Sequence, residues 1–255
     1  MILPNDHTEP IMTGRLTDFS TLTFDCYGTL IDWERGIWDA LQPLIAASGR
    51  SDIDRQTGLM AFAELESAQQ AATPGMLYPD ILRHVHGAFA RRFSLETTAA
   101  MDDTFGASVP HWPAFPDTAD ALRRLIKHFK LVILSNVNVD GFAASNRKLG
   151  VEFDAIYTAQ DVGSYKPNLA SFDHMLERLQ ADHGIARGEI LHTAQSLFHD
   201  HVPATRAGLA KAWIDRQGLS KGGDWGATAV VADQPEVDFL FPTMLAMADT
   251  ADAED

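Results

Sequence analysis

The sequence has 255 residues, with 20 lysines and arginines against 35 aspartates and glutamates, which gives a formal net charge of −15. Nucleic-acid binding depends on clustered cations, so a chain this acidic is a poor candidate for it. A composition of 45% hydrophobic and 22% charged residues is typical of a globular protein, and a single cysteine, Cys26, excludes an internal disulfide and a cysteine-based zinc site.

No segment of the sequence is suited to crossing a membrane. The longest clean apolar runs, such as residues 131–134, fall far short of the roughly 20 residues that a spanning helix needs. The first residues lack the basic region and apolar stretch of a signal peptide. We therefore expect a cytoplasmic protein with neither a membrane nor a nucleic-acid partner.

The first third of the chain divides into three parts. Residues 1–18 show no clear periodicity and are expected to be a surface extension. Residues 22–24 are β-prone and lead into a glycine-containing loop at 25–30, which predicts a strand and a turn. Residues 34–104 carry helical periodicity with no strand signal, which indicates a helical cap inserted between the first strand and the later ones.

Residues 105–240 alternate between strand and helix patterns and, with residues 19–33, form the predicted core domain. Strands are expected at 131–134, 155–157, 189–193 and 211–214, and helices at 116–127, 139–149, 168–179 and 199–207. This alternation predicts an α/β fold with a doubly wound, Rossmann-like parallel sheet, covered by helices on both faces. Residues 241–255 end in ADTADAED and are expected to be a frayed acidic tail.

Polar residues follow each predicted strand, where open parallel sheets bind their ligands. Asp25 follows the first strand, Ser135 and Asn136 the second, Lys166 the third, and Asp200 comes shortly after the fourth. We expect these groups to converge on one edge of the sheet. A lysine beside a carboxylate favours its ionised form, which suits a carboxylate nucleophile.

Four segments in this order resemble the motifs of the haloacid dehalogenase superfamily, over roughly residues 22–216. They are Phe24–Leu30, Leu134–Asn136, Tyr165–Pro167, and the region from Asp200 to Arg216. The superfamily consists mostly of phosphatases, which have a second aspartate two residues after the nucleophile and an acidic pair after the fourth strand for magnesium. Here Tyr27 and Gln195-Ser196 stand in those places.

This pattern resembles the L-2-haloacid dehalogenase branch, which implies no metal and no cofactor. The implied function is hydrolysis of a small 2-haloacid through an aspartyl ester, giving a 2-hydroxy acid with inverted configuration. Alternatives that stay open are a magnesium-dependent phosphatase, a hydrolase for another leaving group such as fluoride or a ring nitrogen, and a non-catalytic member of the fold. The implied partner is a small carboxylate, with a homodimer as the candidate assembly.

The resemblance also implies roles for the motif residues. Asp25 is the nucleophile, Thr29 orients it, Lys166 holds it ionised and steadies the oxyanion, and Asp200 positions Lys166 or the hydrolytic water. Ser135 assists binding of the substrate carboxylate. The implied substrate-binding residues are Cys26, Tyr27, Asn136 and Gln195.

Several positions depart from the dehalogenase pattern. The cap arginine that draws off the halide is replaced by Ala61, a usual tyrosine by Phe172, and a usual serine and asparagine by Gln195 and Leu197. Candidate replacements for halide binding are Gln69, Gln70, Tyr78, Arg83 and Asn138.

The aromatic and imidazole side chains near these motifs have weaker assignments. Trp33 and Phe198 are candidates for lining the pocket or packing in the core. His192, His199 and His201 would suggest a metal cluster only if the fold brought them together, and we expect His192 to lie apart from the other two.

The net charge bears on capture of an anionic substrate. A charge of −15 repels a carboxylate within the screening length of roughly 8–10 Å. We therefore expect a locally positive pocket, and a catalytic efficiency that salt leaves unchanged or raises.

Overall fold

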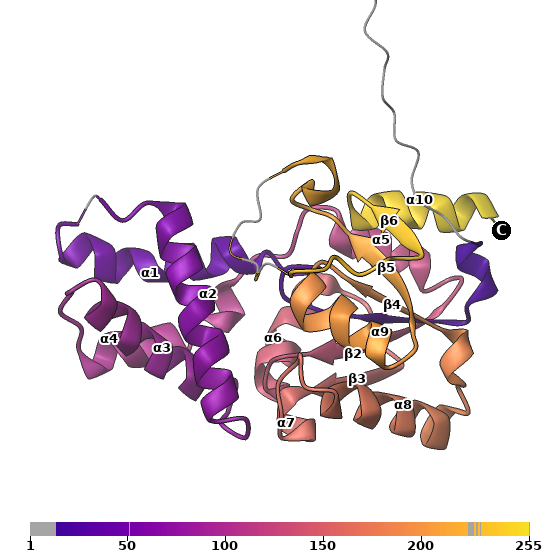
Figure 1. Ribbon diagram of the computed structural model, residues 1–255, viewed down its shortest axis with the longest axis horizontal. Coiled ribbons are helices and arrows are strands. Elements are labelled where there is room, and N and C mark those ends of the chain that lie inside the picture. Colours follow the sequence, from indigo (N-terminus) through magenta and orange to yellow (C-terminus); the bar gives the residue numbers. More distant parts are fainter. Residues whose placement is uncertain (1–13, 51, 224–226, 228, 230, 255) are drawn as a thin grey trace, which may run out of the picture.

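The computed structural model describes residues 14–50, 52–223, 227, 229 and 231–254. Within this part, six parallel strands form one sheet in the order β3-β2-β1-β4-β5-β6. The strands are β1 (Thr21–Phe24), β2 (Lys130–Ser135), β3 (Ala155–Thr158), β4 (Ile190–Ala194), β5 (Ala210–Ile214) and β6 (Phe239–Phe241). The predicted doubly wound α/β fold is confirmed, and β1 lies at its centre between β2 and β4 (Figure 1).

Each face of the sheet has its own apolar core, because side chains alternate along a strand. In β2, Leu131 and Ile133 join one cluster, and Val132 and Leu134 join the other. The first cluster includes residues of α5 (Thr118–Leu125), α6 (Val139–Leu149) and α10 (Met244–Glu254). The second includes residues of α8 (Ala170–His183) and α9 (Val202–Arg206), while the short α7 spans Ala159–Val162.

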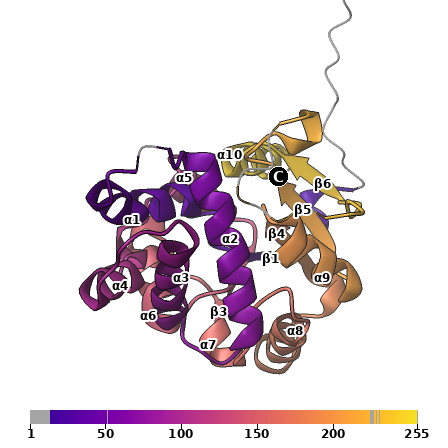
Figure 2. The ribbon, with the colours of Figure 1, turned by 60° about the vertical axis from the view of Figure 1, so that its left-hand side comes forward.

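The inserted segment is helical, as predicted. It contains α1 (Trp33–Ala47), α2 (Arg55–Ala72), α3 (Tyr78–Arg92) and α4 (Ala99–Gly106), which gather beside the sheet (Figures 1 and 2). Helix α1 begins at Asp32, whose carboxylate accepts a hydrogen bond from the Arg35 backbone N–H. Its Gly36 packs directly against the buried ring of Trp112, which fixes α1 against the core.

Two expectations about the ends of elements are wrong. The segment expected to be a frayed tail contributes α10, whose Met244, Met247, Ala248 and Ala251 are buried. Asp117 makes no side-chain capping bond to α5, because its carboxylate pairs with Arg216 at 3.1 Å.

The amino-terminal extension is described only from residue 14. There Leu16 is buried in a short 3-10 helix, so the end of the predicted extension packs on the core. None of the described helices is long and apolar enough to cross a membrane.

Candidate active site

Asp25 lies just beyond the carboxyl end of the central strand, where β1 leads into a tight loop. Thr29 Oγ1 donates a hydrogen bond of 2.7 Å to Asp25 Oδ2, and Lys166 Nζ donates one of 2.9 Å to Asp25 Oδ1. Asp25 is 5% exposed and Lys166 is 1% exposed. Both oxygens of this carboxylate are therefore held in fixed directions, as the assigned roles of Thr29 and Lys166 require.

Lys166 joins the ends of three strands. Besides Asp25, its ammonium donates to the Leu134 carbonyl at 2.8 Å and to Asp200 Oδ1 at 2.6 Å. An ammonium has three donors, and all three are used. The predicted convergence of Asp25, Lys166 and Asp200 is thus present in the structure, and Asp200 bonds directly to Lys166.

The two carboxylates have different environments. Burial raises the pKa of Asp25, and Lys166 opposes that rise. Burial would also raise the pKa of Asp200, but Lys166 and His192 outweigh it and hold that pKa below its usual range. Despite burial, the same two carboxylates raise the pKa of Lys166, so its ammonium stays charged. Asp25 is therefore the more basic carboxylate, which suits the group that attacks.

His192 is a member of this site that sequence reasoning set aside. Its Nε2 donates to Asp200 Oδ1 at 3.1 Å, and its Nδ1 lies 2.9 Å from Thr23 Oγ1. The ring is fully buried and packs edge-on against Phe172, with 5.1 Å between ring centroids. The hydrogen bonds extend from Thr23 through His192 and Asp200 to Lys166. His192, a residue of β4, therefore helps to hold Lys166 in place through Asp200.

The remaining motif residues serve the site less directly. Asn136 exchanges two hydrogen bonds with the Lys166 backbone, at 2.7 and 2.9 Å, and so fixes the lysine loop.

The Tyr27 ring lines the cavity, but its hydroxyl lies 2.9 Å from Ser145 Oγ. Ser135 is buried, with no hydrogen-bond partner for its Oγ among the described residues. Gln195 lines the cavity and donates to Gln217 at 2.7 Å.

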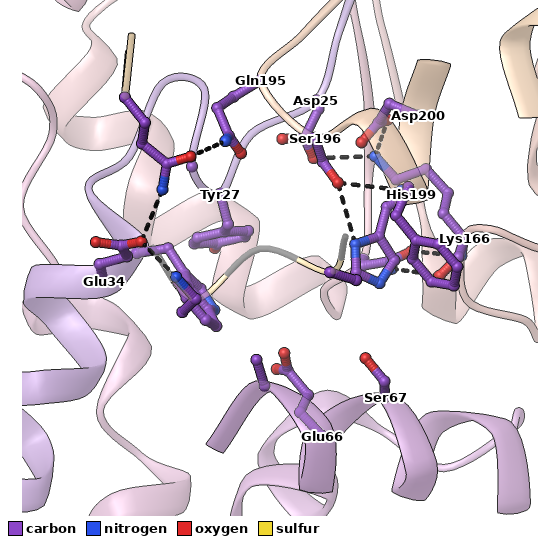
Figure 3. A pocket seen from close by; sticks show the side chains of 18 of the residues that line it. Asp25, Tyr27, Glu34, Glu66, Ser67, Lys166, Gln195, Ser196, His199 and Asp200 are labelled. Atoms are coloured by element: carbon purple, nitrogen blue, oxygen red, sulfur yellow. Dashed lines mark hydrogen bonds and ion pairs between the residues drawn. The ribbon is translucent and has the colours of Figure 1, made fainter. Parts of the chain in front are cut away.

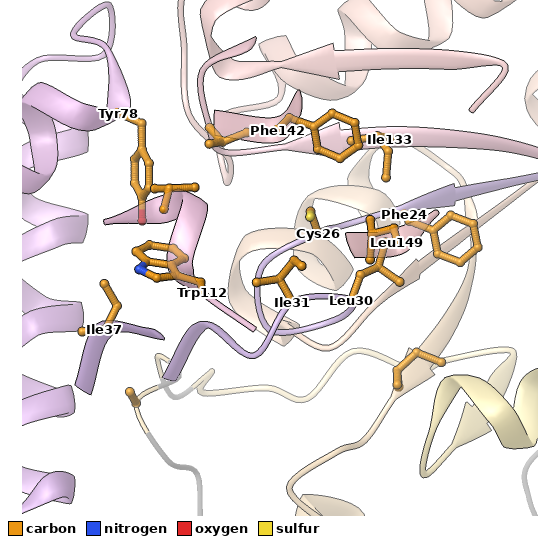
Figure 4. Close-up of a cluster of buried hydrophobic side chains, with 14 of the residues drawn as sticks. Phe24, Cys26, Leu30, Ile31, Ile37, Tyr78, Trp112, Ile133, Phe142 and Leu149 are labelled. Carbon is orange, nitrogen blue, oxygen red and sulfur yellow. The ribbon is translucent and has the colours of Figure 1, made fainter. Parts of the chain in front are cut away.

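The expected substrate-binding role of Cys26 is wrong as far as its side chain is concerned. The thiol is fully buried among apolar residues such as Phe24 and Ile31 (Figure 4). Burial raises the pKa of the Cys26 thiol well above its usual value. A neutral buried thiol behaves as a small apolar group, so Cys26 packs in the core next to Asp25.

A cavity of about 700 Å³ opens in front of Asp25, between the strand ends and the cap helix α2 (Figure 3). Trp33 and Phe198 both line it. Two of the halide candidates, Gln70 and Tyr78, also line it, whereas the described lining does not include Gln69, Arg83 or Asn138. Ala61 is buried in the core rather than facing the cavity.

The donors around Asp25 fit magnesium poorly. Magnesium prefers carboxylate and water oxygens in an octahedron, and here both carboxylates already hold the Lys166 ammonium. No group of three or more His, Cys, Asp and Glu side chains in the described chain could hold a metal ion.

The three histidines considered as a metal cluster in the sequence have separate partners. His192 contacts Asp200, His199 contacts Ser196, and His201 contacts the Ala194 carbonyl.

Comparison with known proteins places this chain in a family. A family model described as haloacid dehalogenase-like hydrolase matches residues 19–192. The chain belongs to the haloacid dehalogenase-like hydrolases. A search of curated protein sequences gave no match.

Solved structures share the fold of this hydrolase over 79–96% of its length. A defluorinating L-2-haloacid dehalogenase, Rha0230, is 18% identical at a TM-score of 0.74, over 96% of this chain and all of that one. The Xanthobacter autotrophicus L-2-haloacid dehalogenase with chloropropionic acid covalently bound is 20% identical, with a TM-score of 0.73 over 93% of this chain and all of that one. A putative Bacillus subtilis HAD-hydrolase bound to magnesium, YfnB, is 20% identical, with a TM-score of 0.65 over 79% and 90% of the two chains.

Proposed function

We propose that this hydrolase cleaves the carbon–halogen bond of 2-haloacids through an ester on Asp25, without a metal ion. The observation that carries the proposal is the Asp25 carboxylate itself. It is buried, bonded to Lys166 and Thr29, and faces a cavity large enough for a substrate. The similarity in fold to L-2-haloacid dehalogenases supports the same choice.

In the first step, an Asp25 oxygen attacks the carbon that bears the halogen, from the side opposite the leaving group. A new carbon–oxygen bond forms as the carbon–halogen bond breaks, and the halide departs with the bonding electrons. A halide needs no proton to leave, so this step requires no general acid. Tyr27, in the place where phosphatases have their acid, is consistent with that chemistry, because burial raises the pKa of its hydroxyl well above the usual value.

In the second step, water attacks the carbonyl carbon of the Asp25 ester. Lys166 steadies the oxyanion that forms, and the bond between this carbon and the ester oxygen, the Asp25 oxygen that attacked in the first step, then breaks. One water proton passes to the departing oxygen and the other leaves to solvent. Asp200 Oδ2 is buried and has no hydrogen-bond partner among the described residues, so it can accept a hydrogen bond from this water. The product is a 2-hydroxy acid of inverted configuration.

A paired assay tests this proposal. The purified protein is incubated with 2-chloropropionate or with a panel of phosphate monoesters, each with and without EDTA, and free halide or phosphate is measured. We expect halide release that EDTA does not affect, and its loss in the Asp25→Asn variant. Phosphate release that requires magnesium would overturn the proposal, as would a fully active Asp25→Asn variant.

A further inference from the structure

The cap wall of the cavity carries polar groups that the mechanism above does not use. Ala63, Glu66, Ser67 and Gln70 recur at the spacing of one helical face, and all four line the cavity from α2. Figure 3 shows Glu66 and Ser67 on the cap helix, across the cavity from Asp25 and Lys166. We call the residues Glu66, Ser67 and Gln70 the α2 polar strip.

Glu66 is a buried carboxyl group without a cationic partner among the described residues. It is 8% exposed, and its Oε1 accepts a hydrogen bond of 2.6 Å from the Tyr78 hydroxyl. Burial raises the pKa of Glu66 to about 7. A buried carboxylate is costly unless it is paired, so Glu66 is poised to gain from a positive charge brought in by a ligand.

Gln70 lies one helical turn further along α2. It is 6% exposed, and its side chain makes no hydrogen bond within the described part of the chain. Buried amides are normally hydrogen-bonded. A ligand in the cavity would supply the missing partner, which is a second and independent sign that something polar binds against this wall.

The described cations that line the cavity do not favour a second anionic group on the substrate, in addition to its carboxylate. Arg55 pairs with Glu34 at 3.3 Å, Arg216 pairs with Asp117 at 3.1 Å, and Lys166 is shared by Asp25 and Asp200. Each described cation that lines the cavity therefore already faces a carboxylate. Among the buried acidic side chains of the described lining, Asp25 and Asp200 pair with Lys166, whereas Glu66 has no cationic partner.

The cavity is also larger than a short haloalkanoate needs. Pockets with a volume of about 300–1,000 Å³ bury drug-sized ligands, and the volume of this cavity is about 700 Å³. Trp33, Met60 and Phe198 provide apolar surface along it. A chain of several methylene groups can lie against these side chains between Asp25 and the α2 polar strip.

We propose that the substrate carries an ammonium group that binds Glu66 and Gln70, at the far end of an alkyl chain whose halogen-bearing carbon lies at Asp25. This inference rests on the proposed dehalogenase function and adds a substrate class to it, namely 2-halo acids with a terminal amine. The Tyr78 hydroxyl holds Glu66 in place for that contact.

The test compares two 2-bromo acids of equal chain length, one ending in an ammonium group and the other in a methyl group. We expect kcat/KM for halide release to be at least about tenfold higher for the amine, since a desolvated charge pair is worth about that factor. Glu66→Gln keeps the size of the side chain and removes its charge. It should abolish the preference and leave the rate with the methyl-ended acid unchanged.

Glu64→Gln is the matched control. Glu64 lies on the same helix and lines the same cavity, but its side chain is 60% exposed and pairs with Arg92 at 2.6 Å. This variant should keep the preference for the amine. Equal rates for the two acids in the wild type, or a preference that survives Glu66→Gln, would overturn the proposal.

A binding measurement separates this inference from the proposed function. If none of these acids releases halide, the dehalogenase function fails. Quenching of tryptophan fluorescence by a linear alkylamine, with the alcohol of equal length as the reference, still tests the ammonium site. Binding of the amine that is lost in Glu66→Gln supports the site, and equal binding to both proteins contradicts it.

Discussion

Lys166 and Asp200 form a buried ion pair in which Lys166 Nζ lies 2.6 Å from Asp200 Oδ1, with both side chains about 1% exposed. The same ammonium holds Asp25, so one positive charge serves two carboxylates. Removing one member of a buried pair leaves an uncompensated charge, which costs roughly 3–5 kcal/mol. Under the proposed mechanism, stability and catalysis therefore depend on the same three side chains.

The Lys166→Met variant should lose activity and stability together. Halide release should fall to the background rate, because Asp25 loses the charge that keeps it ionised and steadies the oxyanion. The free energy of unfolding at neutral pH should fall by several kcal/mol, on the order of the cost of breaking a buried pair. Denaturant unfolding checks the stability, and part of the loss should return at low pH, where the carboxylates become neutral.

The His192→Phe variant should slow the second step more than the first. Without the hydrogen bond from His192, Asp200 is less firmly placed to hold Lys166 and the water. The Asp25 ester should then accumulate, and intact-mass spectrometry during turnover would detect it. His192→Gln, whose amide can donate from a similar position, should restore much of the rate. Equal slowing of both steps, with no ester, would show that His192 only supports the fold.

The stability should depend on pH through Glu66. The pKa of this carboxyl is raised from 4.5 to about 7 by burial, so the folded state binds more protons than the unfolded state between these values. Its contribution to stability is complete below about pH 4.5 and is lost as the pH rises through about 7. Relative to Glu66→Gln, the wild type should lose no more than about 3 kcal/mol across this window. Denaturant unfolding at several pH values measures the difference, and parallel curves for the two proteins would contradict it.

The Gly36→Ala variant should destabilise the contact between cap and core. An added Cβ would lie 2.3 Å from Trp112 Cγ, which is closer than any real contact. Overpacking of this kind costs about 1–3 kcal/mol, so the melting temperature should fall. Gly188→Ala is the control, because nothing lies within 4 Å of its added Cβ, and it should melt like the wild type.

The meeting of Asp25, Lys166 and Asp200 was predictable because the topology of a parallel sheet brings strand ends together. Asp25, Lys166 and Asp200 each follow a different strand, and the structure places them within hydrogen-bonding distance. His192 was not predicted to join them, because it lies inside a strand and its direction depends on which face of β4 it takes. In the α2 polar strip, Gln70 was a sequence candidate for halide binding, but Glu66 and Ser67 were missed because helical periodicity does not say how the cap is oriented over the sheet.

The C-terminal helix was missed for a different reason. Its acidic and small residues give a weak overall signal, and the segment was interpreted from its charge. Yet Met244, Met247, Ala248 and Ala251 follow the spacing of one helical face. That periodicity was available in the sequence and outweighs composition as a sign of a packed helix.

The origin of the product oxygen tests the central claim most directly. A single turnover is run in water labelled with heavy oxygen, with the protein in excess over a 2-haloacid, and the product and the Asp25 peptide are analysed by mass spectrometry. An ester on Asp25 predicts an unlabelled 2-hydroxy acid and one heavy oxygen in the Asp25 carboxylate. A labelled product with an unlabelled Asp25 would show that water attacks the substrate directly, and would contradict the assignment of Asp25 as the nucleophile.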